Sequence, residues 1–155
     1  MSMTVEQQLQ VLVDIQEITN LKASYCNAAD CGWDRPSNDA DTIASLFVAD
    51  GVWDAGSFGK AEGREAIRQK FKADLYPLGF HNISNPIVKV DGDTATGQWH
   101  VLAPCIYNPA DNQSIWIAGI YNDEFVRTPE GWKFKKLHVT IAFTGTNAQG
   151  WDVAR

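Results

Sequence analysis

His81 and Asp30 are the two residues whose types and setting best suit acid–base chemistry. His81 begins a run of strand-forming residues, in FHNISN, and Asp30 ends a helical segment, in YCNAAD. A buried carboxylate that accepts a hydrogen bond from one imidazole nitrogen fixes the tautomer and makes the other nitrogen a better base. Asp30 is therefore either a solvated group at the helix end or the buried partner of an imidazole, and the second alternative predicts a catalytic pair.

Tyr25 is a third candidate, because it precedes Asp30 by five residues and lies near the same face of the predicted helix. A phenol there could donate a hydrogen bond to a substrate carbonyl or to an oxygen that gains charge during a reaction. The alternative is that Tyr25 is an ordinary core residue.

Strand alternation separates His81 from the other two histidines, His100 and His138. Successive side chains of a strand point to opposite faces. The neighbours of His100 and His138 are apolar or aromatic and are expected to face inward, which turns both histidines outward. The residues expected inward are Trp99, Val101, Ala103, Cys105, Leu137, Val139 and Ile141.

No pattern of metal ligands or cofactor-binding glycines is present. The three cysteines, Cys26, Cys31 and Cys105, have no CxxC spacing, and the chain has no HExxH, P-loop or GxSxG motif. We therefore expect no metal and no cofactor. Cys105 is expected to face the pocket as a small apolar group, since no second base accompanies it.

Helical periodicity predicts a first helix from about Thr4 to Ala29, with a capping box formed by Thr4 and Gln7. The pattern also predicts a short second helix from Asp39 and a third after Gly63. Between them, Asp50-Gly51 is predicted as a turn and two short segments as strands. The second helix is expected to carry Ile43, Leu46 and Phe47, and the short strands are Val52–Asp54 and Phe58–Lys60.

Four longer segments rich in Val, Ile, Trp, Tyr and Phe are predicted as strands: Phe80–Val90, Thr94–Ile106, Ser114–Arg127 and Trp132–Phe143. Helices followed by an antiparallel meander indicate an α+β fold in one domain over residues 1–155. A curved sheet with helices on one face leaves a concave pocket. Its expected apolar walls are Trp53, Phe58, Trp99, Ile120 and Leu137.

The composition and charge of the chain limit the classes of binding partner. The net charge of −6 argues against nucleic acid, and no apolar run is long enough to span a membrane, so a cytoplasmic location is expected. A small hydrophobic molecule is the expected ligand. An outward face is expected to carry Trp116, Tyr121, Trp132 and Phe134, and so much exposed aromatic surface predicts a homo-oligomer.

The chain resembles the SnoaL-like branch of the nuclear transport factor 2-like superfamily. The resemblance rests on IQEITNLKASYCNAAD, LFVADGVWD, EGREAIRQKF, FHNISNPIVKVDGDTATGQW and YNDEFVRTPEGWKFKKLHV. It implies a cone-shaped α+β barrel, with three helices packed on a strongly curved, mostly antiparallel sheet that encloses a pocket. The similar members are scytalone dehydratase, bile acid 7α-dehydratase and hexachlorocyclohexane dehydrochlorinase.

This resemblance implies cofactor-free elimination by a His–Asp pair, here His81 and Asp30. The tyrosine of the dehydratases corresponds to Tyr25, and a site asparagine of scytalone dehydratase corresponds to Asn122. Two positions depart from the family. Cys105 stands near the second acid–base residue of the dehydratases, and Leu137 stands where the dehydrochlorinase has an arginine.

The resemblance thus implies a lyase that acts on a small apolar, cyclic substrate. An isomerase or cyclase that uses the same proton abstraction is an alternative, and so is a protein that binds a small hydrophobic ligand without catalysis. Dehydratase members imply a trimer, and other branches imply a dimer.

Overall fold

The computed structural model describes residues 3–73, 77–108 and 113–147. Its helices are α1 (Val5–Ala29), α2 (Ala40–Ser45) and α3 (Arg64–Ala73). The Thr4 hydroxyl accepts from the backbone N–H of Gln7, and the Gln7 side chain accepts from the backbone N–H of Thr4, so the predicted capping box is confirmed. Asp39 caps α2 by accepting from the Thr42 backbone N–H at 2.9 Å.

The strands form one mixed sheet in the order β2-β1-β7-β6-β5-β3, with β4 also paired to β5. Among the described strands, β1 and β7 pair in parallel and all other pairings are antiparallel. The strands are β1 (Phe47–Asp54), β2 (Lys60–Glu62), β3 (Leu78–Gly79), β4 (Asn82–Asp91), β5 (Thr94–Asn108), β6 (Gln113–Thr128) and β7 (Gly131–Asn147). The predicted α+β class, with three helices on a strongly curved and mostly antiparallel sheet, is confirmed.

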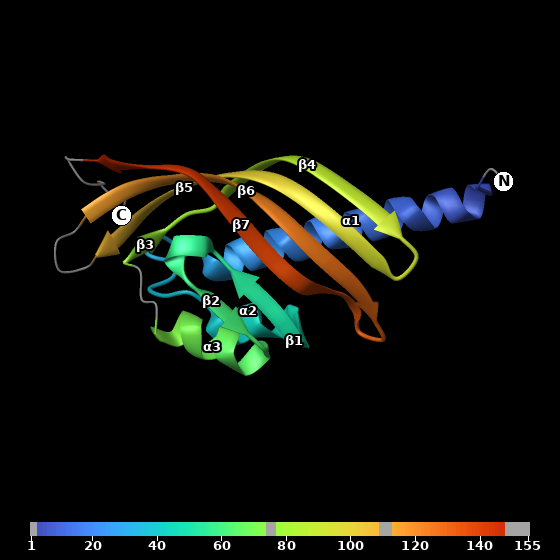
Figure 1. The fold of residues 1–155 in the computed structure, drawn as a ribbon, viewed down its shortest axis with the longest axis horizontal. Helices are drawn as coiled ribbons and strands as arrows, with labels where there is room; N and C mark the ends of the chain where they lie inside the picture. The colour runs from blue at the N-terminus through green and yellow to red at the C-terminus, as the bar shows by residue number, and fades with distance from the viewer. Residues whose placement is uncertain (1–2, 74–76, 109–112, 148–155) are drawn as a thin grey trace.

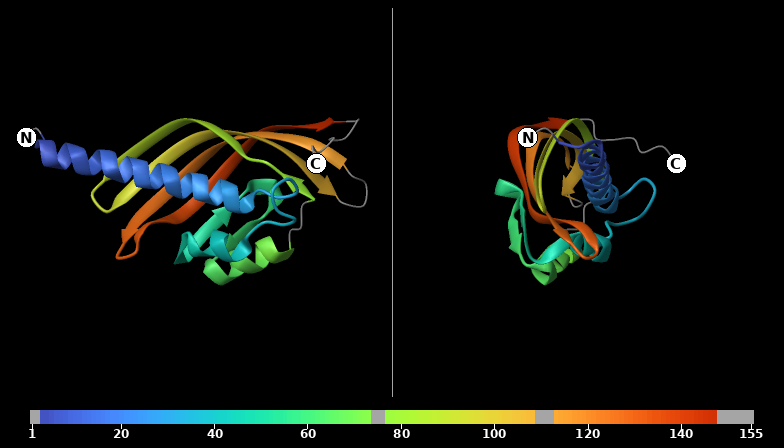
Figure 2. Two further views of the ribbon diagram at one scale, coloured as in Figure 1. Left: turned by 180° about the vertical axis from the view of Figure 1, so that it is seen from behind. Right: turned by 90° about the vertical axis from the view of Figure 1, so that its right-hand side faces the viewer.

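The sheet curves around α1, as the end-on view in Figure 2 shows. In Figure 1, α1 runs along the concave side of β4 to β7, and the strands β1 and β2 of the same sheet lie below these long strands, together with α2 and α3. The other end of α1 extends past the sheet, where Leu9 and Leu12 are exposed. The core therefore lies between α1, the concave face of the sheet and the α2–α3 layer.

Two short predictions are wrong. Asp50-Gly51 is not a turn between elements: β1 continues through it, and a register shift between Phe47 and Val52 accommodates these residues. Phe47 consequently lies in β1 rather than in α2. The expected strand Phe58–Lys60 is instead the end of a 3₁₀ turn (Gly56–Phe58) followed by β2.

The expected outward position of Trp132 and Phe134 is also wrong, because both side chains are buried. A β-bulge explains the error. Glu124 pairs with Lys136, but Phe125 pairs with Phe134, so Lys135 is an extra residue in β7. An extra residue reverses the alternation on its two sides, so Trp132 and Phe134 share the inner face with Leu137.

Inside the described residues, no helix is long and apolar enough to cross a membrane.

Candidate active site

A small backbone bridge brings Asp30 and His81 together. Asp30 is the C-cap of α1, and its backbone N–H donates to Cys26 at 2.9 Å. The next residue, Cys31, exchanges two backbone hydrogen bonds with Gly79, of 3.0 and 3.1 Å. This antiparallel bridge places the end of α1 beside the segment that leads into β4, where His81 lies.

The Asp30 carboxylate holds His81 at two points. Asp30 Oδ1 lies 2.7 Å from His81 Nδ1 and also accepts from the His81 backbone N–H at 2.8 Å. The aspartate side chain is 6% exposed and the imidazole 22% exposed. A buried carboxylate thus fixes a half-buried ring, and since Nδ1 is directed to Asp30, Nε2 is the nitrogen that can exchange a proton with another molecule.

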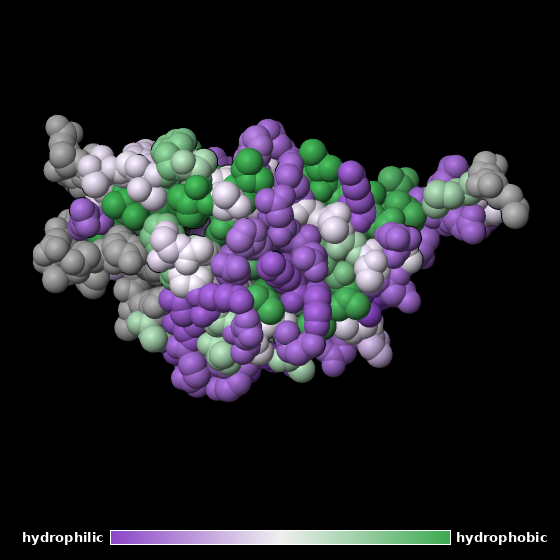
Figure 3. Space-filling model, in the orientation of Figure 1, coloured by the Kyte–Doolittle hydropathy of each residue, from purple (hydrophilic) through white to green (hydrophobic). Residues whose placement is uncertain are grey.

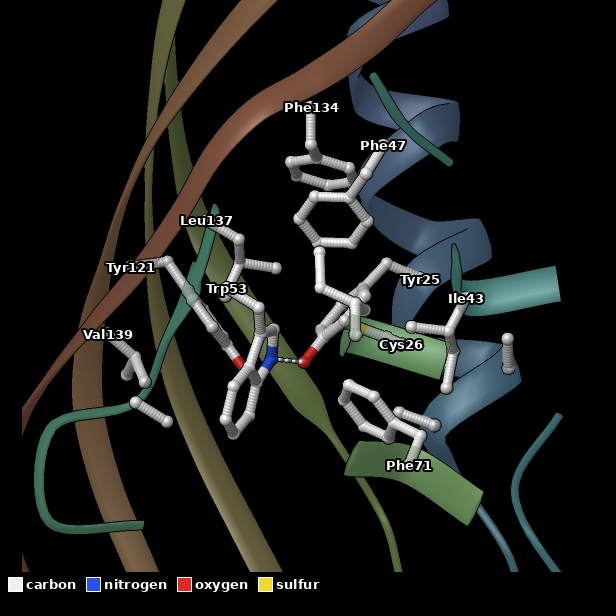
Figure 4. Close-up of a cluster of buried hydrophobic side chains, with 14 of the residues drawn as sticks. Tyr25, Cys26, Ile43, Phe47, Trp53, Phe71, Tyr121, Phe134, Leu137 and Val139 are labelled. Atoms are coloured by element: carbon white, nitrogen blue, oxygen red, sulfur yellow. Dashed lines mark hydrogen bonds between the residues drawn. The ribbon is translucent and has the colours of Figure 1, made fainter. Parts of the chain in front are cut away.

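Tyr25 packs edge-on against the rings of both His81 and Tyr121. Its ring centroid is 6.3 Å from that of His81 and 6.5 Å from that of Tyr121. Trp53 Nε1 donates to the Tyr25 hydroxyl oxygen at 2.8 Å, the bond drawn as a dashed line in Figure 4. Donation to a phenol oxygen polarises its O–H bond, so the hydroxyl becomes a stronger donor.

These groups open into a cavity of about 110 Å³ under the concave face of the sheet. Most of its lining is apolar, and its polar groups include His81, Tyr25 and Tyr121. The other lining residues are Ala29, Asn38, Trp53, Ala55, Phe58, Phe71, Gly79, Phe80, Val101, Ala103, Cys105, Ile117, Val139 and Ile141. An apolar chamber with a few convergent polar groups is typical of small-molecule sites.

Two expected wall residues lie on the inner face but not at this cavity. Trp99 is buried against Phe125, with ring centroids 6.1 Å apart, and Leu137 is fully buried in the core. Neither lines the cavity. Both are core residues because the cavity occupies only one end of the concave face.

The expected inward positions of Ile120 and Asn122 are wrong. Ile120 is exposed on the outer face, and Asn122 also lies on that face, where it accepts from the Gln98 side chain at 2.8 Å. Tyr121, predicted to face outward, is buried and lines the cavity. Figure 4 shows its hydroxyl directed toward the space beside Trp53 and Tyr25.

A buried ion pair explains why alternation did not identify the inner face of β6. Asp123 has the same parity as Tyr121 and faces inward, where its carboxylate lies 2.8 Å from the ammonium of Lys22 and both side chains are fully buried. Because a charged residue normally faces solvent, Asp123 makes the inner side of β6 resemble the outer one. Neither Tyr121 nor Lys22 has a sequence pattern that singles it out as a site residue. Asn38, a further polar lining residue, lies in an irregular loop where alternation gives no guidance.

The other two histidines face away from the cavity, as predicted. His100 is exposed and lies 3.1 Å from the side chain of Asn85, and His138 Nδ1 lies 3.4 Å from Asp54 Oδ2.

The cavity thiol is a poor candidate for a base or nucleophile. Cys105 lines the cavity, and its burial raises the pKa of the thiol to about 11. A thiol with that pKa is almost entirely protonated near neutral pH. Within residues 3–73, 77–108 and 113–147, no three His, Cys, Asp or Glu side chains come together as metal ligands.

A helix-lined, curved sheet with a largely apolar cavity defines the class of SnoaL-like, nuclear transport factor 2-like folds. Residues 10–138 match the SnoaL-like domain family. The chain belongs to this family.

A curated relative supports the same assignment. The chain is 34% identical over 134 residues to the uncharacterized protein Rv2910c of Mycobacterium tuberculosis, covering 84% of this chain and 86% of the relative.

Solved structures share the fold. A hexachlorocyclohexane dehydrochlorinase, LinA type 2, has a TM-score of 0.81 and 25% identity, covering 96% of this chain and 97% of its own. A scytalone dehydratase-like protein from Novosphingobium aromaticivorans has a TM-score of 0.73 and 23% identity, covering 88% and 89%. The fold is therefore one that dehydratase- and dehydrochlorinase-like proteins share.

Proposed function

We propose that the protein is a cofactor-independent lyase that removes water or another leaving group from a small apolar, cyclic substrate. The observation that carries this proposal is the double hydrogen bond by which the buried Asp30 carboxylate holds His81 at the cavity. Burial of a carboxylate has a desolvation cost. An imidazole held in one orientation at an apolar cavity is what proton abstraction needs.

In the proposed reaction, His81 Nε2 takes a proton from a substrate carbon next to a carbonyl or to the carbon that bears the leaving group. Asp30 accepts from Nδ1–H, keeps the ring in the required tautomer and stabilises the imidazolium that forms. The electron pair released from the C–H bond forms the new double bond as the leaving group departs. His81 can then return the proton to the departing oxygen when that group is hydroxyl.

The substrate oxygen that gains charge or departs is placed near the two tyrosine hydroxyls. Tyr25, polarised by Trp53, donates one hydrogen bond. Tyr121 takes the part that the resemblance assigned to Asn122, since it is Tyr121 that lines the cavity. Burial raises the pKa of Tyr121 well above its usual value, so the phenol remains protonated and able to donate.

The remaining walls support the substrate class. Phe58, Phe71 and Val101 offer flat or branched apolar surface. The cavity volume of about 110 Å³ favours a small molecule.

The same site geometry is compatible with two other functions. Returning the proton to a different carbon would make the protein an isomerase or cyclase. A binding protein for small hydrophobic molecules would use the same walls, but it would have no need for a base held by a buried carboxylate.

The test is turnover of hydroxylated or halogenated cyclic compounds, followed as appearance of the alkene. His81→Ala is expected to abolish turnover, whereas His100→Ala, which removes an outward histidine, is expected to have no effect. Asp30→Asn should keep the geometry but lower kcat by roughly 10²-fold or more, with a smaller change in KM. Because the mechanism uses no metal, turnover should persist in a chelator.

Near wild-type activity of His81→Ala would show that the proton goes elsewhere. Tight ligand binding by all variants, without turnover in any, would establish the binding-protein alternative instead.

A further inference from the structure

Behind Tyr121 lies an ion pair that the mechanism above does not use. Lys22 of α1 and Asp123 of β6 are both fully buried, with Nζ and Oδ2 2.8 Å apart. Buried ion pairs contribute little to stability relative to apolar side chains of similar size, because desolvation offsets their attraction. Stability alone therefore does not account for two charges in the middle of this core.

The ammonium of Lys22 is enclosed by aromatic rings. It lies 3.1 Å from the ring centroid of Tyr121 and 5.2 Å from that of Tyr25. The rings of Trp99 and Phe134 complete the enclosure at 5.5 and 5.8 Å. The two rings nearest the cation are thus those of the two tyrosines that line the cavity.

Asp123 of β6 holds the cation by a direct contact. Its Oδ1 accepts from the His138 backbone N–H of β7 at 3.1 Å, while Oδ2 binds Lys22. Burial lowers the pKa of Lys22 and raises that of Asp123, and the attraction between the two groups opposes both shifts. Contact with Asp123 and with the faces of the tyrosine rings favours the charged ammonium. The cation is consequently held between α1, β6 and β7.

We propose that the Lys22–Asp123 pair is a positioning device for the reaction, in which the ammonium holds the Tyr121 ring with its hydroxyl in the cavity and strengthens its hydrogen-bond donation. A cation over the face of a phenol ring draws electron density from it, which makes the O–H a better donor to an oxygen that gains charge. This inference rests on the proposed function for the reaction, but its structural half is independent of turnover.

The experiment compares two double variants. Lys22→Met/Asp123→Asn removes both charges and leaves no buried ion unpaired, so it avoids the folding defect expected of Lys22→Met alone. The control, Asp14→Asn/Arg127→Met, removes another ion pair that joins α1 to β6, but it lies outside the cavity lining. A purely structural role would make the two variants behave alike.

The first readout is NMR of protein labelled with ¹³C-tyrosine, with the Tyr121 signal assigned from Tyr121→Phe. Cyclohexanone serves as the probe ligand. In the wild type and the control, cyclohexanone is expected to shift the Tyr121 ring signals. In Lys22→Met/Asp123→Asn the ring signals should start from different positions, and the response to cyclohexanone should be largely lost.

The second readout is kinetic. In the elimination assay, Lys22→Met/Asp123→Asn is expected to lower kcat roughly tenfold to hundredfold with little change in KM, while the control keeps the wild-type values. Tyr121 signals or a kcat indistinguishable from those of the control would overturn the proposal. If instead His81→Ala retains activity, the proposed function fails, and the NMR comparison still decides the role of Lys22.

Discussion

Tyr121 and Asn122 are neighbours in β6 that face opposite sides of the sheet, and they give a matched pair of substitutions. Tyr121→Phe keeps the ring over Lys22 but removes the hydroxyl from the cavity. Loss of one hydrogen bond to an oxygen that gains charge is expected to lower kcat about tenfold or more. Asn122→Ala should leave kcat within about twofold of the wild type, because its amide lies on the outer face. Steady-state kinetics of the two variants checks both expectations.

The opposite ranking, with Asn122→Ala the more harmful change, would contradict the assignment of the oxygen-binding role to Tyr121.

Tyr25→Phe tests the Trp53–Tyr25 hydrogen bond. The substitution leaves the buried indole N–H of Trp53 without its hydroxyl acceptor, so the free energy of unfolding should fall by about 1–3 kcal/mol. Urea denaturation measures this change, and kcat should fall less than in Asp30→Asn. In Tyr25→Phe/Trp53→Phe the donor is absent as well, so the loss of stability should be smaller than the sum for the single variants. Strict additivity would mean that the two side chains are not coupled.

At the scale of elements, the bridge between the end of α1 and β3 is what carries Asp30 to His81. Gly32 follows this bridge with φ of +87°, and a Cβ there would lie 2.0 Å from the carbonyl oxygen of Pro77. Gly32→Ala must therefore shift the backbone on one side of the bridge. We expect a lower melting temperature together with a loss of turnover.

Gly92→Ala is the matched control, since Gly92 also has positive φ, +59°, but a Cβ there meets no atom within 4 Å. It should lose stability from backbone strain alone, without loss of turnover. Equal kinetic effects of the two changes would exclude a special role for the bridge.

The middle of α1 is tied to β6 by Asp14 and Arg127, whose side chains form hydrogen bonds of 2.7 and 2.8 Å. This contact lowers the pKa of Asp14 from 3.8 to about 2. Because the folded-state pKa is depressed, the stabilisation is fully present above about pH 4 and is lost as the pH falls toward 2. Urea denaturation between pH 5 and 2 should show a steeper loss of stability in the wild type than in Asp14→Asn. Parallel curves would contradict the contribution of Asp14.

Sequence periodicity predicts the existence of the helices and long strands well, but not every strand face. In β5 the inward set Trp99, Val101 and Ala103 is confirmed, because its apolar alternation is uninterrupted. In β6 the alternation misleads, since Asp123 is a buried charge whose partner is about a hundred residues away. In β7 it fails before Lys135, because a bulge leaves no mark in the sequence.

The candidate site depends on tertiary contacts that the spacing of residues along the sequence does not specify. Nothing in the local sequence of Asp30 or His81 specifies the bridge between Cys31 and Gly79 that aligns them. The residue types suggested acid–base chemistry, and the resemblance suggested that His81 and Asp30 meet, as they do in the structure. Neither identified Tyr121, because strand alternation placed it on the outer face and the resemblance pointed to its neighbour Asn122.

At the scale of the whole molecule, the apolar surface lies elsewhere than expected. Three of the four aromatic residues expected on an outward face, Tyr121, Trp132 and Phe134, are buried in the core. The convex face instead exposes Leu102, Ile120 and Phe143, and the register places them on the neighbouring strands β5, β6 and β7. We call these three residues the outer apolar patch. Figure 3 shows hydrophobic residues at the surface over the sheet, while polar residues cover much of the region of α3.

The homo-oligomer remains a prediction, which now rests on the outer apolar patch. Apolar side chains grouped on one sheet face are costly to leave in water, and a second copy of the same chain offers a matching surface. We expect light scattering at micromolar concentration to give an oligomer, with a trimer favoured by the family resemblance. Ile120→Glu/Phe143→Glu should shift the mass to that of a monomer, because charge on the patch opposes its burial. Thr96→Glu adds a charge to the outer face of β5 outside the patch and should leave the oligomer intact. A monomer mass for the wild type would refute the prediction. An oligomer that survives Ile120→Glu/Phe143→Glu would place the interface elsewhere. The exposed residues Leu9 and Leu12 of α1 would then be the next surface to test.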